Sequence, residues 1–196
     1  MPLYQRRFSC VCASNQNRSM AAHNAMIESG FENVWSYGTG SSVKLPGSAA
    51  DKPNIYPFRT PYSQMYDELK SDNEARYIQN GVLRMLERNR KVKMGPERWQ
   101  ENFLPFDFVI TFEERVFDAV LDDFATNRDP LTFEPVYIIN LEIKDTHQEA
   151  ASGATLAVQL AELLDAAEDV HNEIDGILEI FGEQTGQQLL YLPQFY

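Results

Sequence analysis

The stretch FSCVCASNQNRSMAAHN, residues 8–24, decides how we expect the chain to fold at its beginning. Residues 7–12 predict a short strand, and the segment from Arg18 predicts a helix that ends at Gly30, a residue type favoured just past helix ends. The segment NVWSYGTG, residues 33–40, predicts a second strand closed by glycines. A strand, a helix and a strand in this order form a βαβ unit, which indicates a parallel sheet.

The rest of the chain continues the alternation of strands and helices. Residues 106–112 and 136–143 are nearly continuous apolar runs, as expected of strands buried on both faces. Helical patterns cover residues 62–92, 113–125 and 149–183. Residues 41–62 hold four prolines and are expected to form an ordered surface loop. The tail, residues 189–196, predicts either an edge strand or an apolar segment packed on the body.

Four strands alternating with helices predict a three-layer α/β/α fold with a mostly parallel central sheet of four to five strands. The chain has 196 residues, of which 43% are hydrophobic, and this suits one sizeable core. We therefore expect a single domain over residues 1–196. In sheets of this kind the active site lies beyond the carboxyl ends of the strands.

The length of the apolar runs and the number of cysteines indicate where the protein is located and whether it binds a membrane. No apolar run approaches the roughly 18 residues that a membrane span needs, and the first residues lack the apolar region of a secretory signal. The two cysteines, at positions 10 and 12, do not make a disulfide framework. We expect a protein kept inside the cell, without a membrane partner, whose cysteines are thiols.

The charge of the chain is divided unevenly between its halves. The net charge of −12 alone disfavours nucleic acid and anionic substrates. However, residues 1–100 hold 14 of the 17 Lys and Arg and 9 of the 29 Asp and Glu, so their balance is +5, against −17 for the remainder. The first half can therefore host an anion. Its basic run, residues 84–98, has a simpler interpretation as a solvated helix end.

Cys12 stands at the predicted carboxyl end of the first strand, followed by the polar loop ASNQN, residues 13–17, and then by Arg18 and Ser19 at the start of a helix. Such a loop points several backbone N–H groups into one small volume, and the helix dipole adds partial positive charge there. That volume fits a phosphate. The same field favours the thiolate of Cys12, which is the form that attacks phosphorus.

Arg18 can offer two parallel donors to phosphoryl oxygens, and Ser19 can donate to the thiolate when it leaves. The candidate phosphate contacts are Ala13, Ser14, Asn15, Gln16, Asn17, Arg18 and Ser19. The alternative for Cys12 is an ordinary buried cysteine. Arg18 stands six residues after Cys12, but no arginine stands six residues after Cys10, so Cys10 is expected to pack under the loop. A disulfide between Cys10 and oxidised Cys12 is the other possibility, although positions i and i+2 of a strand are awkwardly far apart.

A phosphatase of this design needs a general acid to protonate the leaving oxygen. Asp129 belongs to an Asp-Pro pair that resembles the acid of low-molecular-weight tyrosine phosphatases, but it precedes its strand and is predicted at the wrong sheet edge. Asp145 follows that strand, at the edge of Cys12, and is the preferred acid, with Glu142 as the weaker alternative. Asp145 could instead cap the next helix, and His147 is expected to be a surface residue. No metal-ligand spacing is present, so no metal site and no cofactor are expected.

Several segments resemble, in order and over nearly the whole chain, the RNA polymerase II C-terminal-domain phosphatases of the pre-mRNA cleavage and polyadenylation machinery. The segments are VCASNQNRSMAAHN, YGTGSSVKLPG, DKPNIYPF, YIQNGVLRMLERNRKVK, PERWQ, FDFVITFEERVFDAV and INLEIKDTHQEA. The core of that family resembles low-molecular-weight phosphatases. The resemblance implies removal of phosphate from the fifth-position serine of the polymerase tail heptad, with the Ser-Pro bond read in cis.

The resemblance also implies roles for individual residues. Cys12 would be the nucleophile that forms a phosphocysteine, Arg18 the phosphate clamp and Asp145 the acid. A groove beside the phosphate would be shaped by Lys44, Leu45, Pro46, Tyr77, Asn80, Gly81 and Met85. Glu142 stands where the family usually carries an aspartate, which puts in doubt any fine positioning role there.

The implied partners are the phosphorylated polymerase tail and a symplekin-like scaffold protein of the cleavage and polyadenylation complex, with no direct contact to nucleic acid, and the implied location is the nucleus. Two enzymes with a similar core compete with this prediction. One is a tyrosine phosphatase, and the other is an arsenate reductase, which is disfavoured because no cysteine follows Cys12. A role mainly as a scaffold in the processing complex is the alternative from another class.

Overall fold

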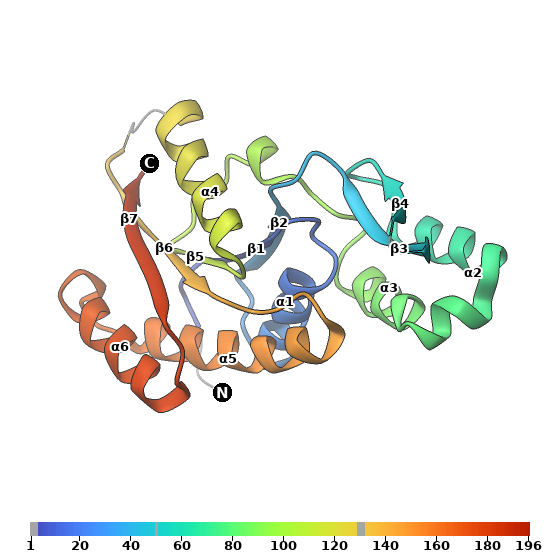
Figure 1. The fold of residues 1–196 in the computed structure, drawn as a ribbon. Helices are drawn as coiled ribbons and strands as arrows, with labels where there is room; N and C mark the ends of the chain where they lie inside the picture. Colours follow the sequence, from blue (N-terminus) through green and yellow to red (C-terminus); the bar gives the residue numbers. More distant parts are fainter. Residues whose placement is uncertain (1–3, 50, 129–131) are drawn as a thin grey trace.

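The computed structural model describes residues 4–49, 51–128 and 132–196 (Figure 1). In chain order its elements are β1 (Phe8–Cys12), α1 (Arg18–Glu28), β2 (Val34–Gly38), β3 (Val43–Ala49), β4 (Lys52–Tyr56), α2 (Tyr62–Gln79), α3 (Val82–Val92), η1 (Trp99–Glu101), β5 (Phe108–Thr111), α4 (Glu114–Asn127), β6 (Pro135–Leu141), α5 (His147–Ala166), α6 (Val170–Thr185) and β7 (Leu189–Phe195). The central sheet has the strand order β2-β1-β5-β6-β7. Its first four strands are parallel, and β7 runs antiparallel to β6.

Alternating side chains along the strands build one apolar layer on each face of the sheet. On one face Cys10 and Ile110 pack with α1, α5 and α6, and on the other Val11 and Val109 pack with α4. Figure 1 shows α4 on one side of the sheet and α1 and α5 on the opposite side. The predicted three-layer fold with a mostly parallel sheet is confirmed, and its five strands include β7, the edge strand expected as one alternative for the tail.

Residues 41–62 differ from the expectation of a loop, because they contain a hairpin of β3 and β4 paired antiparallel. Pro46 and Pro53 fit because a sheet of two strands consists of edges, where a residue need not donate to a neighbour on both sides. Val43 and Leu45 are buried against α2 and α3 in a third apolar cluster. The loop prediction was wrong because prolines argue against central strands, not against edges.

Both long helical segments are divided into two helices. The first is broken between α2 and α3 at Gly81, whose φ of +80° lies in the left-handed region that glycine adopts without strain. The second is broken between α5 and α6, where the side chain of Asp169 accepts a hydrogen bond from Asn172 N and caps α6. The break at Gly81 places α3 alongside the hairpin, so this α2–α3 unit and β3–β4 extend the molecule at one end (Figure 1).

Candidate active site

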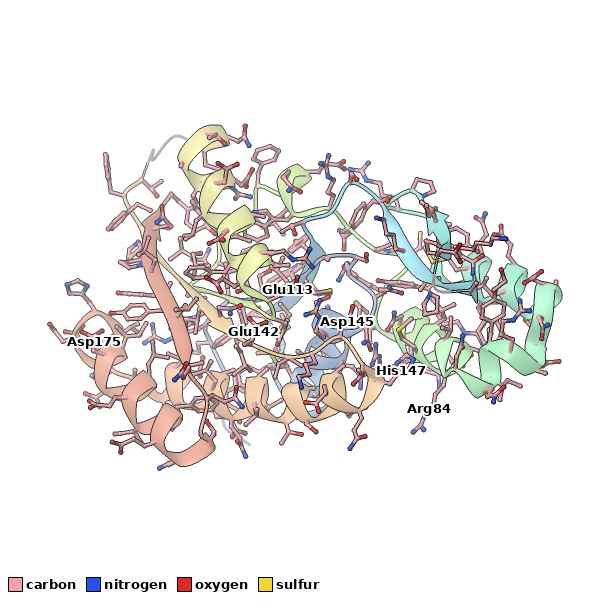
Figure 2. The ribbon with its side chains drawn as sticks, in the orientation of Figure 1. Arg84, Glu113, Glu142, Asp145, His147 and Asp175 are labelled. Carbon is pink, nitrogen blue, oxygen red and sulfur yellow. The ribbon has the colours of Figure 1, made fainter. Side chains whose placement is uncertain are left out.

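The carboxyl ends of β1, β5 and β6 meet at one edge of the sheet because the three strands are parallel. Cys12 is the last residue of β1, Glu113 follows β5 and Asp145 follows β6. Figure 2 shows Glu113, Glu142 and Asp145 at this edge, on the connections between strands and helices. The topology therefore brings the predicted nucleophile and the predicted acid to the same edge.

Cys12 is 3% exposed, and its Sγ lies 3.0 Å from the Oγ of Ser19 in the first turn of α1. Ser19 Oγ also accepts a hydrogen bond of 3.0 Å from Asn15 Nδ2. With one lone pair engaged by Asn15, the hydroxyl can direct its hydrogen to the sulfur. Ser19 is thus placed to donate to the Cys12 thiolate, as the sequence predicts.

Residues 13–17, which we call the phosphate loop, present unused backbone donors. Within the described part of the chain, none of their N–H groups donates a hydrogen bond to another group. The following helix, α1, has Asn17 as its N-cap without a side-chain capping bond and has no acidic residue in its first turn. Asn15 holds a φ of +51°, which bends the loop sharply. Free N–H groups at a helix N-terminus are suited to an anion.

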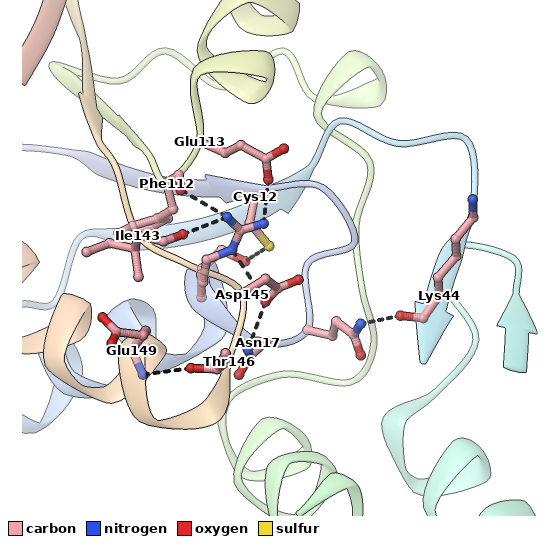
Figure 3. A network of polar contacts seen from close by, with 12 residues as sticks. Cys12, Asn17, Lys44, Phe112, Glu113, Ile143, Asp145, Thr146 and Glu149 are labelled. Carbon is pink, nitrogen blue, oxygen red and sulfur yellow. Dashed lines mark hydrogen bonds and ion pairs between the residues drawn. The ribbon is translucent and has the colours of Figure 1, made fainter. Parts of the chain in front are cut away.

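Arg18 is 4% exposed and is fixed by three hydrogen bonds. Its Nη1 donates to the carbonyl oxygens of Phe112 at 3.0 Å and Ile143 at 2.9 Å, and its Nη2 donates to Glu113 Oε2 at 2.7 Å (Figure 3). Burial alone would lower the pKa of the guanidinium, but the negative charges of Asp145, Cys12 and Glu113 raise it above its ordinary value. Of the five N–H groups of the guanidinium, Nε–H and one on Nη2 remain available for two phosphoryl oxygens.

Asp145 lies beside this guanidinium, with Oδ1 at 3.4 Å from Arg18 Nε and at 2.8 Å from Asn17 Nδ2. Its side chain is 54% exposed, so it lies at the mouth of the site. The alternative that Asp145 caps the next helix is wrong, because Thr146 is the N-cap of α5 and accepts from Glu149 N at 3.2 Å (Figure 3). The carboxyl group of Asp145 is therefore not committed to α5.

The other candidate acids are placed differently. Glu142 Oε2 accepts hydrogen bonds of 3.0 Å each from Glu114 N, at the start of α4, and from Asn140 Nδ2. Its carboxylate is thus engaged at a helix N-terminus, a structural role for which a longer side chain is well suited. Asp129 lies outside the described residues.

A groove of about 440 Å³ opens next to the phosphate loop. It is lined by Gln16, Asn17, Lys44, Leu45, Pro46, Pro53, Asn80, Met85, Asp145, Thr146 and His147. Five of the seven predicted groove residues are thus gathered around one cavity. Tyr77 and Gly81 do not line it. Tyr77 is buried in the α2–α3 unit, and Gly81 lies against His147.

Cys12 and Arg18 do not line the groove. Asn17 and Asp145 do, and Asp145 also contacts Arg18, so the groove and the phosphate loop are neighbours. Lys44 ties the groove wall to the phosphate loop through its backbone, since its N–H donates to Ser14 Oγ at 3.3 Å and its carbonyl accepts from the Gln16 side chain. The Ala13 carbonyl accepts from Gly40 N at 2.9 Å. Figure 3 shows the Lys44 side chain directed away from this backbone contact.

A family model for Ssu72-like proteins matches residues 6–196. The chain belongs to the Ssu72-like family. The RNA polymerase II C-terminal domain phosphatase SSU72 of Danio rerio is 47% identical to it, and that of Homo sapiens is 46% identical, each over 100% of both chains. A solved structure of D. melanogaster Ssu72 with Symplekin, bound to a cis peptidomimetic of the CTD with phosphoserine at position five, is 38% identical over 100% of both chains, with a TM-score of 0.94.

Membership in the Ssu72-like family confirms both the resemblance and the enzyme class predicted from the sequence, a phosphoprotein phosphatase that hydrolyses phosphomonoesters. The TM-score applies to the whole chain, so it includes the hairpin and the α2–α3 unit as well as the central sheet. The elements that carry the groove residues are therefore part of the fold shared with that relative.

Glu113 is a site residue that the sequence did not reveal. Its carboxylate receives Arg18 on one oxygen and Arg115 on the other. Burial tends to raise the pKa of this carboxyl, but the hydrogen bonds from both arginines outweigh it and lower the pKa below its ordinary value of 4.5. The signal in the sequence was its position directly after a buried strand, at the edge where Cys12 was expected. His147, expected at the surface, is exposed but lines the groove.

Cys10 is completely buried and its Sγ lies 3.7 Å from Met26 Sδ of α1. Burial raises the pKa of this thiol, with a smaller contribution from Cys12. Both cysteines are free thiols. Cys10 is therefore a packing residue between β1 and α1, as the sequence predicts.

The part of the chain that the structure describes meets neither the requirements of a metal site nor those of a membrane-spanning helix. Among these residues, no group of three or more His, Cys, Asp or Glu side chains is arranged to hold a metal ion. Over the same ranges, no helix is both long enough and apolar enough to cross a membrane.

Proposed function

We propose that this chain, acting as one phosphatase domain over residues 1–196, removes phosphate from the fifth-position serine of the RNA polymerase II C-terminal-domain heptad through a phosphocysteine on Cys12. The observation that carries this proposal is the buried contact of Cys12 with Ser19, at a loop of free N–H groups closed by Arg18. It is supported by relatives that are named as phosphatases of this tail.

In the first step the Cys12 thiolate attacks phosphorus, and the bond between phosphorus and the serine oxygen breaks. Asp145 gives its proton to that oxygen, which leaves as the serine hydroxyl. The two remaining N–H groups of Arg18 and those of the phosphate loop bind the equatorial oxygens, where negative charge is spread in the transition state. Glu113 holds Arg18 in the orientation that this contact needs.

In the second step water attacks phosphorus, and the bond between phosphorus and sulfur breaks to release inorganic phosphate. Asp145, now a carboxylate, takes the proton of the water. Ser19 donates to the departing thiolate from 3.0 Å and stabilises its negative charge. Neither step requires a cofactor, because the nucleophile, the acid and the cationic clamp all come from the chain.

The groove supplies selectivity for the residue after the phosphoserine. Leu45, Pro46 and Met85 form a compact apolar surface, and such a surface suits a proline whose preceding bond is cis. Asn80 and the Lys44 backbone add polar contacts, while Tyr77 and Gly81 support the wall from behind. The D. melanogaster relative was solved with a cis peptidomimetic that carries the fifth-position phosphoserine, which supports this reading of the groove.

The same relative was solved with Symplekin, and we extend this partner to the present chain as a scaffold protein of the cleavage and polyadenylation complex. The protein would then act in the nucleus, in transcription termination and mRNA 3′-end processing. The net charge of −12 argues against direct binding to nucleic acid, so contact with the transcript would pass through partners.

A Cys12→Ser variant tests the proposal on heptad peptides with phosphoserine at position five and proline after it. The wild type should release phosphate, and the variant should release none. Continued phosphate release by the variant would show that the mechanism is wrong. Faster release by the wild type from a phosphotyrosine peptide than from the phosphoserine peptide would favour a tyrosine phosphatase. An inactive variant that still supports processing complexes would show an additional scaffold role.

A further inference from the structure

The basic segment of α3 contributes two side chains to the outer surface of the phosphate loop. Arg88 Nη2 donates to the carbonyl oxygens of Gln16 at 2.9 Å and of Asn17 at 3.3 Å. Asn89, which is completely buried, donates from Nδ2 to the Gln16 carbonyl at 2.8 Å. Its Oδ1 accepts from Arg88 Nε and Nη2 at 3.0 and 2.8 Å, which fixes the guanidinium. This part of the basic run is therefore not the solvated helix end expected from the sequence.

The two sides of the phosphate loop are used differently. Groups outside the loop donate hydrogen bonds to its carbonyl oxygens. Gly40 N donates to Ala13, the Tyr62 hydroxyl to Asn15, Arg88 and Asn89 to Gln16, and Arg88 to Asn17. Its N–H groups, by contrast, have no acceptor within the described residues. The C=O and N–H of one trans peptide point in opposite directions, so holding the carbonyls outward turns the N–H groups inward.

Arg88 also brings a charge that lacks an acidic partner. Its pKa is lowered to about 10 by burial, against smaller opposing effects of Tyr62 and Cys12, so the guanidinium stays cationic at neutral pH. Within the described residues no carboxylate forms an ion pair with it. A partly buried cation without an acid is costly unless an anion offsets it, and the function proposed above brings a phosphate to the loop that Arg88 contacts.

Building on the function proposed above, we propose that Arg88 and Asn89 are positioning residues of the phosphate site. They hold the carbonyl oxygens of Gln16 and Asn17 outward, so that the N–H groups of the next residues, Asn17 and Arg18, face the phosphate, and the charge of Arg88 favours a bound phosphate. Neither side chain lines the groove, and both act through the loop.

Four variants separate positioning from charge: Arg88→Met, Arg88→Lys, Asn89→Ala and, as a matched control, Arg84→Met. Arg84 lies on the same helix but is exposed and points away from the molecule in Figure 2. Three quantities are measured: kcat/KM for a small aryl phosphate, its inhibition by inorganic phosphate, and the protection that phosphate gives Cys12 against iodoacetamide alkylation at one fixed pH, read by mass spectrometry. Circular dichroism reports whether each variant is folded.

Arg88→Met should lower kcat/KM by about 10-fold to 100-fold and weaken both phosphate inhibition and phosphate protection by about 10-fold. Arg88→Lys should not restore phosphate inhibition, because an ammonium keeps the charge but cannot reproduce the planar fork that binds the loop. Asn89→Ala should weaken phosphate inhibition, and Arg84→Met should change nothing by more than about twofold.

The proposal is overturned if folded Arg88→Met keeps the phosphate inhibition and the phosphate protection of the wild type. If Arg88→Met does not fold, Arg88→Lys and Asn89→Ala serve as the test, and unchanged phosphate inhibition in both variants overturns the proposal. Alkylation of Cys12 and its protection by phosphate can be measured even if the protein does not hydrolyse any substrate. Failure of the proposed function would instead appear as a wild type without phosphatase activity whose Cys12 still responds to these substitutions.

Discussion

Asp145 illustrates how one side chain is left available by its neighbours. Thr146 caps α5, and Glu142, the weaker candidate acid, accepts a hydrogen bond from Glu114 N at the start of α4, so both neighbours hold helix ends. Asp145 instead contacts Asn17 of the phosphate loop and the Nε of Arg18. The acid, the clamp and the loop are therefore linked directly through the side chains of Asp145, Arg18 and Asn17.

Asp145→Asn should slow formation of the phosphocysteine by about 100-fold to 10,000-fold, because an amide cannot protonate the serine oxygen. Rapid-quench measurement of the first turnover on a phosphoserine peptide checks this. Glu142→Gln is the matched control and should lose little in this step. An equal loss from Asp129→Asn, with Asp145→Asn unaffected, would transfer the role to Asp129.

Among the elements, the break between α2 and α3 forms one corner of the groove. His147 Nε2 lies 2.9 Å from the carbonyl oxygen of Asn80, so α5 and this corner are joined. A Cβ at Gly81 would lie 2.9 Å from the His147 ring, and the φ of +80° already disfavours any other residue. The width of the groove therefore depends on a glycine at this position.

Gly81→Ala should lower the free energy of unfolding by about 1 to 2 kcal/mol and displace His147. We expect a higher KM for a phosphoserine-proline peptide with little change for an aryl phosphate, which does not need the groove. Gly176→Ala in α6 is the control, since nothing lies within 4 Å of the added Cβ, and it should stabilise by about 0.5 to 1 kcal/mol. Equal effects of Gly81→Ala on both substrates would contradict the groove assignment.

Sequence reasoning reached the parts of the site that depend on local spacing. Cys12 and Arg18 follow from one loop between a strand and a helix, and Asp145 follows from the parallel order of the strands. Glu113 and Arg88 were missed because their contacts with Arg18 and Gln16 join residues 95 and 72 positions apart. The β3–β4 hairpin was missed because its two strands are edges, where proline is permitted.

Across the whole molecule, His23 links stability to pH. It is buried with Nδ1 at 2.9 Å from Ser36 Oγ, and burial, together with the charge of Lys93, lowers its pKa from 6.5 to about 4. Unfolding therefore takes up a proton at pH values between these two. Above pH 6.5 His23 is neutral in the folded and the unfolded chain, so the folded protein keeps its full stability. As the pH falls from 6.5 toward about 4, only the unfolded chain takes up the proton, and the free energy of unfolding decreases.

The free energy of unfolding should thus fall by on the order of 2 kcal/mol between pH 7 and pH 5 because of His23. Urea titrations at several pH values measure this slope. A His23→Gln variant should be less stable at pH 7 but should show a flatter profile over this range. Identical slopes in both proteins would contradict the account of a buried neutral histidine.

The central claim is that Cys12 and Arg18 bind and attack a phosphoryl group together, and a crystal soaked with vanadate tests it most directly. We predict vanadium bonded to Cys12 Sγ, with its equatorial oxygens contacted by the N–H groups of the phosphate loop and by the two free N–H groups of Arg18. Vanadate bound elsewhere, with Cys12 and Arg18 unliganded at saturating concentration, would contradict the claim.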